Sequence, residues 1–311
     1  MIDTAFAPAY FGKNRQAILD DWFALLRFPT VGVDPKRLGD CARAAAWLKQ
    51  FLRPLGFDVE ILTPPSGLPV PVLFAERPGA EGAMTVLFYG HYDVQPEDPL
   101  DGWQTPPFEP TLIGERVYAR GAQDNKGQLS GFLQAVKARV QAGGRLPTIK
   151  VILEGQEESG SAAVNDLAPI LSARLRADVM MVCDTSSGPE GRPAITAGLR
   201  GVQHFTATLT GPAHDLHSGV HGGVAPNPAQ GIARLLASLH NDDGSIAVAG
   251  FSDRVQPPTD EERALAHQNA LTDEQYGAEV GCPPAGGDGR ADAVTRGSFL
   301  PAIEVNGVHA G

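Results

Sequence analysis

MTVLFYG (84–90), which runs directly into His91, Tyr92 and Asp93, is the stretch of sequence that decides the fold. A short apolar run bounded by Gly is typical of a buried strand. Polar residues placed just beyond such a strand lie at its carboxyl end, which is where ligands bind in an open α/β sheet. His91 and Asp93 are therefore candidate site residues.

Two further apolar runs have the same arrangement. IKVILEG (149–155) is followed by Glu157 and Glu158, and DVMMVC (178–183) is followed by Asp184. If the three strands are neighbours, the polar residues at their carboxyl ends converge on one site. A histidine with several carboxylates is a hard, oxygen-rich set that suits one or two divalent metals. The pattern therefore indicates a metallohydrolase.

Alternating helical and strand patterns fill the first two thirds of the chain. Apolar residues recur at helical spacing over 13–28 and over 40–53, where Asp40 is the expected N-cap. Further helices are expected near 126–142 and 161–173, and strands near 57–62, 70–76, 84–90, 148–154 and 178–183. This alternation predicts an α/β fold with a mixed, largely parallel twisted sheet flanked by helices.

The pattern changes near residue 197. HFTATLTG (204–211) alternates polar and apolar residues as a half-exposed antiparallel strand does, and AIEVNG (302–307) looks like another strand. An amphipathic helix is expected over 227–240, and the Gly- and Pro-rich segment 281–292 indicates a surface loop. We therefore predict two domains, residues 1–196 and a smaller α+β domain over residues 197–311.

Charge and cysteine content exclude several classes of protein. The chain has 311 residues and a formal charge of −11, without a Lys/Arg-rich run, which argues against nucleic acid as a partner. Cys41, Cys183 and Cys282 are too widely separated for a disulfide framework or a structural zinc site. The N-terminus lacks the layout of a signal peptide, and no apolar run is long enough to span a membrane. We expect a cytoplasmic protein that binds neither nucleic acid nor membranes.

The first candidate residues have both a functional and a structural interpretation. His91 and Asp93 are two residues apart on an extended segment, so they point the same way and Asp93 can fix the tautomer of a metal-bound His91. The structural alternative is a buried pair without a metal. Asp124 can bridge two cations through its two oxygens, or it can cap the helix that follows.

The adjacent residues Glu157 and Glu158 are aimed differently by their backbones. One can bind a metal while the other remains free as a general base for water. Adjacent Glu residues are also common on solvated surfaces, and an isolated Asp184 at a strand end can simply begin a turn. The buried strand before the pair and the Ser-Gly-Ser turn after it (159–161) favour a site.

Five motifs, in order along the chain, resemble one family. They are HYDVQP (91–96), RGAQDNKGQ (120–128), EGQEESGS (154–161), GLRG (198–201) and DLHSGVHGG (215–223). The chain is similar to the dinuclear metallopeptidase family of carnosinase-like dipeptidases, acetylornithine deacetylase, succinyl-diaminopimelate desuccinylase and aminoacylase. HYDVQP, with Trp103 and PPFEP (106–110) downstream, resembles the dipeptidase branch.

This resemblance implies a site for two divalent metal ions, with zinc expected first and manganese or cobalt as alternatives. His91 and Asp184 would hold one metal ion. Glu158 would hold the other, and Asp124 would bridge the two.

The resemblance also implies the catalytic roles. Glu157 would be the general base toward a metal-bridging hydroxide, and Asp93 would orient the metal-bound imidazole. The Asp124–Asn125 peptide would be cis. His217 would lie in a lid domain, the segment 197–311, and would reach the partner subunit's site to stabilise the oxyanion. We therefore expect a homodimer formed through the lid.

One departure from the family pattern concerns the second metal. In the family this metal takes a further histidine from a segment after the lid, and His309 falls at the wrong place in the pattern. We therefore expect that the end of the lid and the return to the catalytic sheet lie outside residues 1–311. This puts the activity of the chain by itself in question.

The leading hypothesis is a metal-dependent dipeptidase that hydrolyses small peptide substrates. An N-acyl-amino-acid deacylase on the same scaffold is the alternative, because it would use the same metals and the same base. A catalytically silent binding protein is a third hypothesis, motivated by the incomplete ligand set. Against it, every expected ligand position within the chain carries a chemically competent residue.

Overall fold

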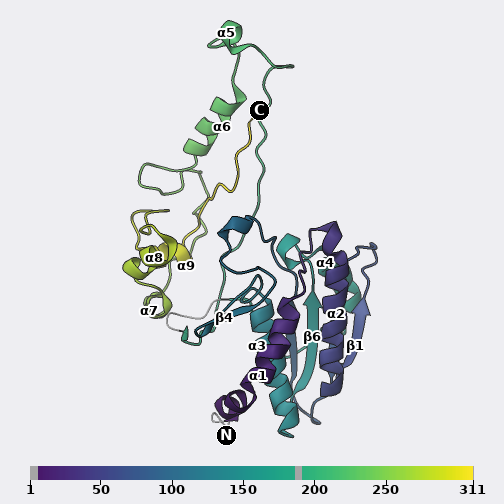
Figure 1. Ribbon diagram of the computed structural model, residues 1–311. Helices are drawn as coiled ribbons and strands as arrows, with labels where there is room; N and C mark the ends of the chain where they lie inside the picture. The colour runs from purple at the N-terminus through teal and green to yellow at the C-terminus, as the bar shows by residue number, and fades with distance from the viewer. Residues whose placement is uncertain (1–5, 186–190, 311) are drawn as a thin grey trace. The chain divides into compact units, whose positions relative to one another are not determined.

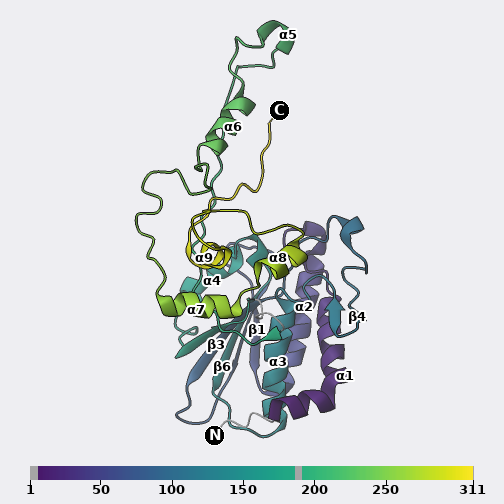
Figure 2. The same ribbon diagram turned by 90° about the vertical axis from the view of Figure 1, so that its left-hand side faces the viewer.

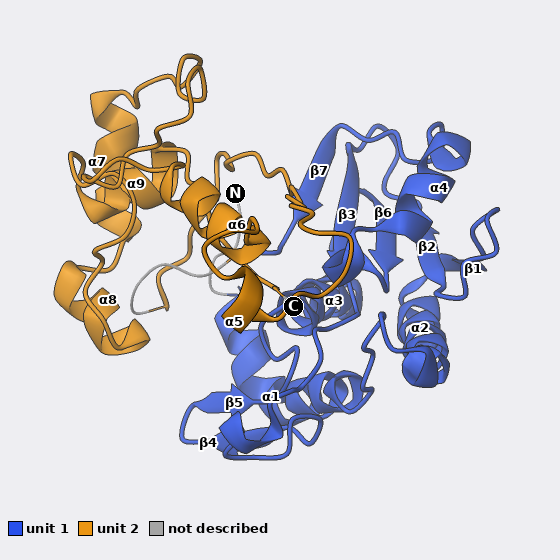
Figure 3. Cartoon of the chain, turned by 90° about the horizontal axis from the view of Figure 1, so that it is seen from above, with its two compact units in different colours: residues 1–184 blue, residues 185–311 orange. Residues whose placement is uncertain are grey.

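The computed structural model describes residues 6–185 and 191–310. The chain divides into two compact units, Met1–Asp184 and Thr185–Gly311, which are coloured separately in Figure 3. The change of pattern near residue 197 falls inside the second unit, and the domain boundary drawn from it stays a prediction. The units are described one at a time.

A mixed five-stranded sheet forms the centre of the first unit. Its strand order is β1-β2-β6-β3-β7, with β3 parallel to both β6 and β7, and β2 antiparallel to both β1 and β6. The bounds are β1 Asp58–Leu62, β2 Val72–Arg77, β3 Thr85–His91, β6 Thr148–Glu154 and β7 Val179–Val182. Each expected strand of this unit is present, and the predicted α/β fold with a helix-flanked mixed sheet is confirmed.

Four helices cover the two faces of this sheet. Helices α1 (Phe6–Leu26), α2 (Leu38–Leu52) and α3 (Lys126–Gln141) lie along one face, as Figures 1 and 2 show, and α4 (Ala162–Leu171) packs on the other. The alternation of strand side chains explains both layers. On β6, for example, Val151 and Leu153 face the core on the α2 and α3 side, whereas Ile152 faces α4.

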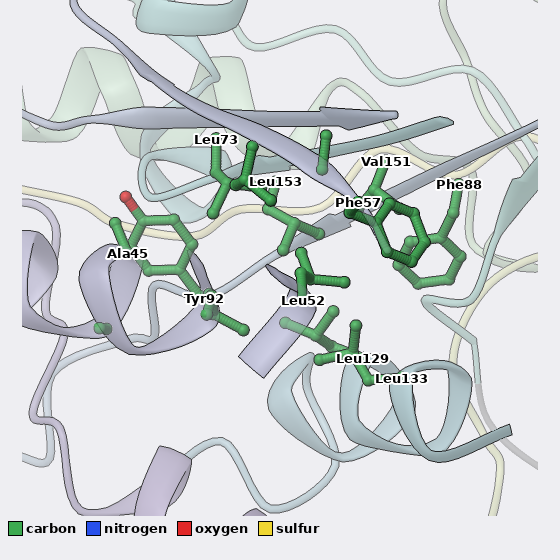
Figure 4. Close-up of a cluster of buried hydrophobic side chains, with 14 of the residues drawn as sticks. Ala45, Leu52, Phe57, Leu73, Phe88, Tyr92, Leu129, Leu133, Val151 and Leu153 are labelled. Atoms are coloured by element: carbon green, nitrogen blue, oxygen red, sulfur yellow. The ribbon is translucent and has the colours of Figure 1, made fainter. Parts of the chain in front are cut away.

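The larger core lies between the sheet and helices α2 and α3, and Figure 4 shows ten of its side chains with labels. Leu48 and Leu52 of α2 and Leu129 of α3 are fully buried there. Phe88 of β3, also fully buried, stacks on Phe132 of α3 with ring centroids 3.8 Å apart. This stacking fixes the position of α3 against the strand that leads to His91.

Replacement of Phe88 by Ala should destabilise the first unit by about 3–5 kcal/mol, because it leaves a cavity and removes the stack on Phe132. Urea unfolding should show a lower midpoint with an unchanged slope. The control is Ile170→Ala on α4, whose side chain is 64% exposed, and it should change the midpoint little. Equal effects of the two substitutions would contradict this account of the core.

Helix α2 and the hairpin of β4 and β5 differ from the sequence-based expectation. Helix α2 begins at Leu38, so Asp40 lies in its first turn and the prediction that Asp40 is the N-cap is wrong. Arg37, which precedes the helix, makes no side-chain cap. The hairpin of β4 (Thr111–Ile113) and β5 (Arg116–Tyr118) was not anticipated, because strands of three residues give too short a pattern.

The regular elements in the described part of the second unit are short helices joined by long loops. It contains α5 (Ser218–His221), α6 (Pro228–Ala237), α7 (Asp260–Asn269), α8 (Asp273–Val280) and α9 (Ala293–Phe299). Helix α6 confirms the helix expected over 227–240, and the loop over 281–292 is present between α8 and α9.

The strands expected over 204–211 and 302–307 are absent from the described residues, so that prediction is wrong. Alternation marks a segment that can pair, but a ladder also requires a neighbouring strand and a covered face. An isolated pair of strands is marginal in water. The alternating pattern was therefore insufficient evidence here.

Strand β7 stands out by its exposure. The side chains of Val179, Met180, Met181 and Val182 are between 43% and 57% exposed, on both faces of the strand. Within the described residues, β7 pairs with β3 alone.

None of the helices in the described residues is both long enough and apolar enough to cross a bilayer.

Candidate metal centre

The candidate site lies at the carboxyl ends of the parallel strands. His91 is the last residue of β3, Glu157 follows β6, and Asp184 follows β7. The loop before α3 brings Asp124 to the same place. One ligand atom from each of His91, Asp124 and Asp184 lies within 4.8 Å of the other two. The convergence expected from the three apolar runs is thus present for these side chains.

The imidazole of His91 is the centre of this group. His91 is fully buried, and its Nε2 lies 3.1 Å from Asp124 Oδ1, 3.5 Å from Asp184 Oδ2 and 3.9 Å from Glu157 Oε2. Its other nitrogen, Nδ1, lies 3.2 Å from Asp93 Oδ1. One nitrogen therefore faces three carboxylates while the other is held by a fourth.

Asp93 connects His91 to the segment that carries the two glutamates. Its buried carboxylate accepts hydrogen bonds from the backbone N–H of Glu157 at 3.2 Å and of Glu158 at 3.1 Å. When His91 is neutral, a proton on Nδ1 donates to Asp93 and leaves Nε2 free to bind a metal. The contact that the H-x-D spacing predicts is present, and the orienting role of Asp93 stays a prediction.

The loop between α1 and α2 makes hydrogen bonds to the backbone that follows β3. The hydroxyl of Thr30 donates to the carbonyl of Tyr92 at 2.5 Å, and the N–H of Val94 donates to the carbonyl of Thr30 at 3.0 Å. At Gly32 an added Cβ would lie 2.3 Å from the carbonyl oxygen of Gly155, so a side chain cannot be accommodated there. The backbone on both sides of Asp93 is therefore fixed.

Burial and neighbouring charges shift the pKa values of two groups in the site. Burial opposes the charged form of His91, but the hydrogen bond to Asp93 and the surrounding carboxylates outweigh it and raise the pKa of His91 to about 9. Partial burial, assisted by the nearby charges of Asp184 and Glu158, raises the pKa of Glu157 above its usual value. A raised carboxyl pKa suits a general base that works near neutral pH.

The stability of the metal-free chain should depend on pH through His91. The pKa of about 9 in the folded chain exceeds the value of about 6.5 expected when unfolded. Protonated His91 therefore contributes stability, roughly 3 kcal/mol, that is fully present below pH 6.5 and is lost as pH rises through 9.

The test compares the free energies of unfolding of wild type and His91→Gln in a chelating buffer from pH 6 to pH 9.5. Groups that titrate in both proteins cancel in the difference. The stability advantage of the wild type should be largest at pH 6 and should shrink toward pH 9.5. A difference that does not change with pH would be inconsistent with a raised pKa of His91.

The predicted site residues Glu158 and His217 have hydrogen-bond partners of their own. The carboxylate of Glu158 accepts a hydrogen bond from Gln95 Nε2 at 2.8 Å. His217 lies in the second unit, where its Nδ1 accepts from the N–H of Gly219 at 3.0 Å. Their roles as second-metal ligand and oxyanion stabiliser stay predictions.

Asp124, in the loop before α3, had two possible roles, a metal ligand or the N-cap of that helix. The N-cap position of α3 is Asn125, without a side-chain capping bond, so Asp124 does not cap the helix in this structure. Its side chain contacts His91 instead. The Asp124–Asn125 peptide bond is cis, as the resemblance implies.

Sequence reasoning missed Gln95, which belongs to the same HYDVQP motif as His91. The side-chain amide of Gln95 donates both to the carboxylate and, at 3.3 Å, to the backbone carbonyl of Glu158. Its position directly after the histidine segment was the available signal. The partner of an exposed glutamine, however, is fixed by the tertiary structure and has no sequence pattern.

The donor set fits a divalent metal. An imidazole nitrogen and carboxylate oxygens from three separate segments meet at one place, with the exposed Asp124 open to solvent and His91 fully buried. Three carboxylates beside one imidazole place negative charge together that a cation would offset. Carboxylate and imidazole ligands are those of zinc, manganese and cobalt sites.

Fold and site together define an α/β metallohydrolase. The chain belongs to the M20/M25/M40 peptidase family, whose model matches residues 87–305. Among curated relatives, it is 31% identical to the Cys-Gly metallodipeptidase of Candida albicans over 91% of this chain and 61% of that protein. It is also 31% identical to the Beta-Ala-His dipeptidase of Rattus norvegicus, over 93% of this chain and 61% of that one. The resemblance drawn from the motifs, including its dipeptidase side, is confirmed.

Solved structures agree with this assignment. Human carnosine dipeptidase 1 superposes with a TM-score of 0.72 at 31% identity, over 88% of this chain and 60% of that one. An M20 family metallo-carboxypeptidase from Sulfolobus solfataricus gives a TM-score of 0.78 at 28% identity, over 94% of this chain and 66% of that one. The chain spans about three fifths of the length of the first two curated relatives named above.

Proposed function

We propose that this chain contributes the metal-binding centre of a dipeptidase that hydrolyses small unblocked dipeptides. The observation that carries the proposal is the convergence of His91, Asp124 and Asp184 at the strand ends, with Glu157 Oε2 3.9 Å from His91 Nε2. The two relatives named as Cys-Gly and Beta-Ala-His dipeptidases support the choice of substrate class.

The residues of this chain have separate tasks in the proposed reaction. His91, Asp124 and Asp184 would hold a metal, and Asp93 would keep Nε2 of His91 free to bind it. Bound divalent metal would polarise the scissile carbonyl and lower the pKa of water. The carboxylate of Glu157 accepts a proton from the attacking water and delivers it to the leaving amine.

A substrate panel tests this function in the longest natural form of the protein. Cys-Gly and β-Ala-His, together with other unblocked dipeptides, are assayed beside N-acetyl and N-succinyl amino acids, each with zinc, manganese and cobalt. We expect turnover of the dipeptides. Turnover of the acylated amino acids alone would assign the protein to the deacylases, which would use the same centre.

Metal binding tests the proposal independently of turnover. We propose two divalent ions, zinc first, with the site of His91, Asp124 and Asp184 the tighter one. The second site would involve Glu158. Titration of the chain with Zn²⁺ should therefore show one site clearly tighter than any other. Binding of less than one equivalent after loading would favour the silent binding protein.

We also propose a cytoplasmic homodimer in which His217 acts in the partner subunit's site. The support is the location of His217 in the second unit, distant in sequence from the strand-end ligands, together with the exposed apolar residue Leu235 on helix α6 of the same unit. Cys41, Cys183 and Cys282 are all free, as is usual in a reducing compartment.

Subunit mixing tests the trans role of His217. Subunits with His217→Ala are mixed with subunits carrying Glu157→Ala, both in the longest natural form. A mixed dimer would contain one site with both residues intact, so part of the activity should return. Absence of recovery, despite demonstrated subunit exchange, would exclude the trans role.

A further inference from the structure

The side chain of Asn125 bridges two neighbouring strand ends that no ladder hydrogen bond connects. Strands β3 and β7 pair in parallel as far as Tyr89 and Val182. Beyond that register, His91 and Asp184 are left without a main-chain connection between their strands. Both residues are proposed metal ligands, so their spacing decides whether they can hold the same ion.

Every hydrogen-bonding atom of the buried Asn125 amide is used at this gap. Its Oδ1 accepts from the backbone N–H of His91 at 3.3 Å. Its Nδ2 donates to the carbonyl of Cys183 at 2.6 Å and to Asp184 Oδ1 at 3.0 Å. The reverse orientation would place the amide oxygen against two acceptors, so the donors and acceptors around it determine how the amide lies.

The backbone on either side of Asn125 is adapted to this arrangement. The N–H of Leu129 donates to the carbonyl of Asn125 at 2.9 Å, which ties the residue to the first turn of α3. At Gly90 an added Cβ would lie 3.1 Å from Asn125 Oδ1. The absence of a side chain at Gly90 therefore leaves room for the amide beside β3.

We propose that Asn125 is a positioning residue that sets the distance between His91 and Asp184 and selects the oxygen of Asp184 that binds the metal. An amide that accepts from β3 and donates to the segment after β7 does what one more peptide of a sheet ladder would do. The bond to Oδ1 occupies that oxygen. It leaves Oδ2, which lies 3.5 Å from His91 Nε2, directed toward the metal position.

This inference rests on the proposed metal centre, and the first experiment separates the two. Zn²⁺ affinity is measured by calorimetry for wild type, Asn125→Ala and the control Asn14→Ala. Asn14 also donates a side-chain bond, to the carbonyl of Tyr10, but it lies on α1 away from the ligands. We expect a 10- to 100-fold loss for Asn125→Ala, as is typical of residues that support metal ligands, and no loss for the control.

The outcomes of this titration are distinct. If wild type binds no Zn²⁺, the proposed function fails. If wild type binds and Asn125→Ala binds equally well, the positioning role fails.

The visible absorption of the Co²⁺-loaded chain should also change in Asn125→Ala, because the Asp184 carboxylate is then free to bind through both oxygens. An unchanged spectrum would oppose the selection of one oxygen.

A double-mutant cycle tests whether Asn125 acts through Asp184. The Asn125→Ala/Asp184→Asn protein should bind Zn²⁺ about as weakly as the weaker single variant. If the loss of Zn²⁺ affinity in the double variant equalled the product of the two single losses, the two residues would act independently. That result would overturn the proposal.

A measurement on wild type covers the case in which Asn125→Ala does not fold. The side-chain NH₂ protons of Asn125 should exchange slowly with solvent, because both have acceptors in a buried position, and their NMR shifts should move on saturation with Zn²⁺. Fast exchange and unmoved shifts would refute the role of Asn125 without any substitution.

Discussion

Glu157→Gln should reduce kcat by about 10²–10⁴-fold in the longest natural form of the protein and leave KM and Zn²⁺ affinity nearly unchanged. The size follows from the usual contribution of general acid–base catalysis. The amide of Gln keeps the shape of the side chain but cannot accept a proton from water. Glu157 is not among the residues whose ligand atoms lie within 4.8 Å of one another, which are His91, Asp124 and Asp184, so we expect the metal to be held without it.

The matched control for Glu157 is Glu81→Gln, an exposed residue before β3, at the end of the sheet opposite the site. It should change neither kcat nor metal content. Near-normal turnover of Glu157→Gln would remove Glu157 as the base. Loss of bound metal together with activity would instead make Glu157 a ligand.

Asp93→Asn should lower Zn²⁺ affinity about 10- to 100-fold and destabilise the metal-free chain by on the order of 3 kcal/mol. The Asp93 carboxylate accepts from the backbone N–H groups of Glu157 and Glu158 and lies against Nδ1 of His91. An amide has one acceptor atom fewer and adds a donor, so at least one of these buried donors would face another donor. The effect on affinity is measured by titration and the effect on stability by urea unfolding.

Asp101→Asn, in an exposed segment, is the control for this substitution and should behave as wild type. The kinetic consequence is a second check. Because Asp93 fixes both the imidazole and the backbone of Glu157, kcat should fall even when the enzyme is saturated with metal. If kcat of Asp93→Asn recovered fully at high Zn²⁺, Asp93 would orient the metal ligand His91 without affecting the general base Glu157.

The sheet of the first unit could be predicted because its strands are local apolar runs with clear ends. β3 and β6 are largely buried on both faces, so their sequences contain the apolar runs VLFY (86–89) and VIL (151–153), which can be recognised without knowledge of a partner strand. The segment 204–211 shows the opposite case. Its polar and apolar residues alternate as in a strand, but a strand also needs a neighbouring strand to pair with. In the described residues the segment 204–211 pairs with none.

Part of the candidate site could also be predicted from the sequence. His91, Asp124 and Asp184 could be found because each is placed by a strand or helix boundary. Gln95 and Asn125 could not, since the acceptors of their amides come from Glu158 and from Cys183 with Asp184, which are distant in sequence. The adjacency of two glutamates likewise predicts different roles without showing which side chain turns toward His91.

The exposed strand β7 has a consequence for handling the protein. Four consecutive apolar side chains beside a row of backbone donors and acceptors form a template for intermolecular sheet extension. Among the described residues the other edge of β7 has no partner strand, so we expect concentrated samples of this chain to self-associate through that edge. A lysine at Met181 would act as a gatekeeper, because a growing stack of strands would have to bring like charges together.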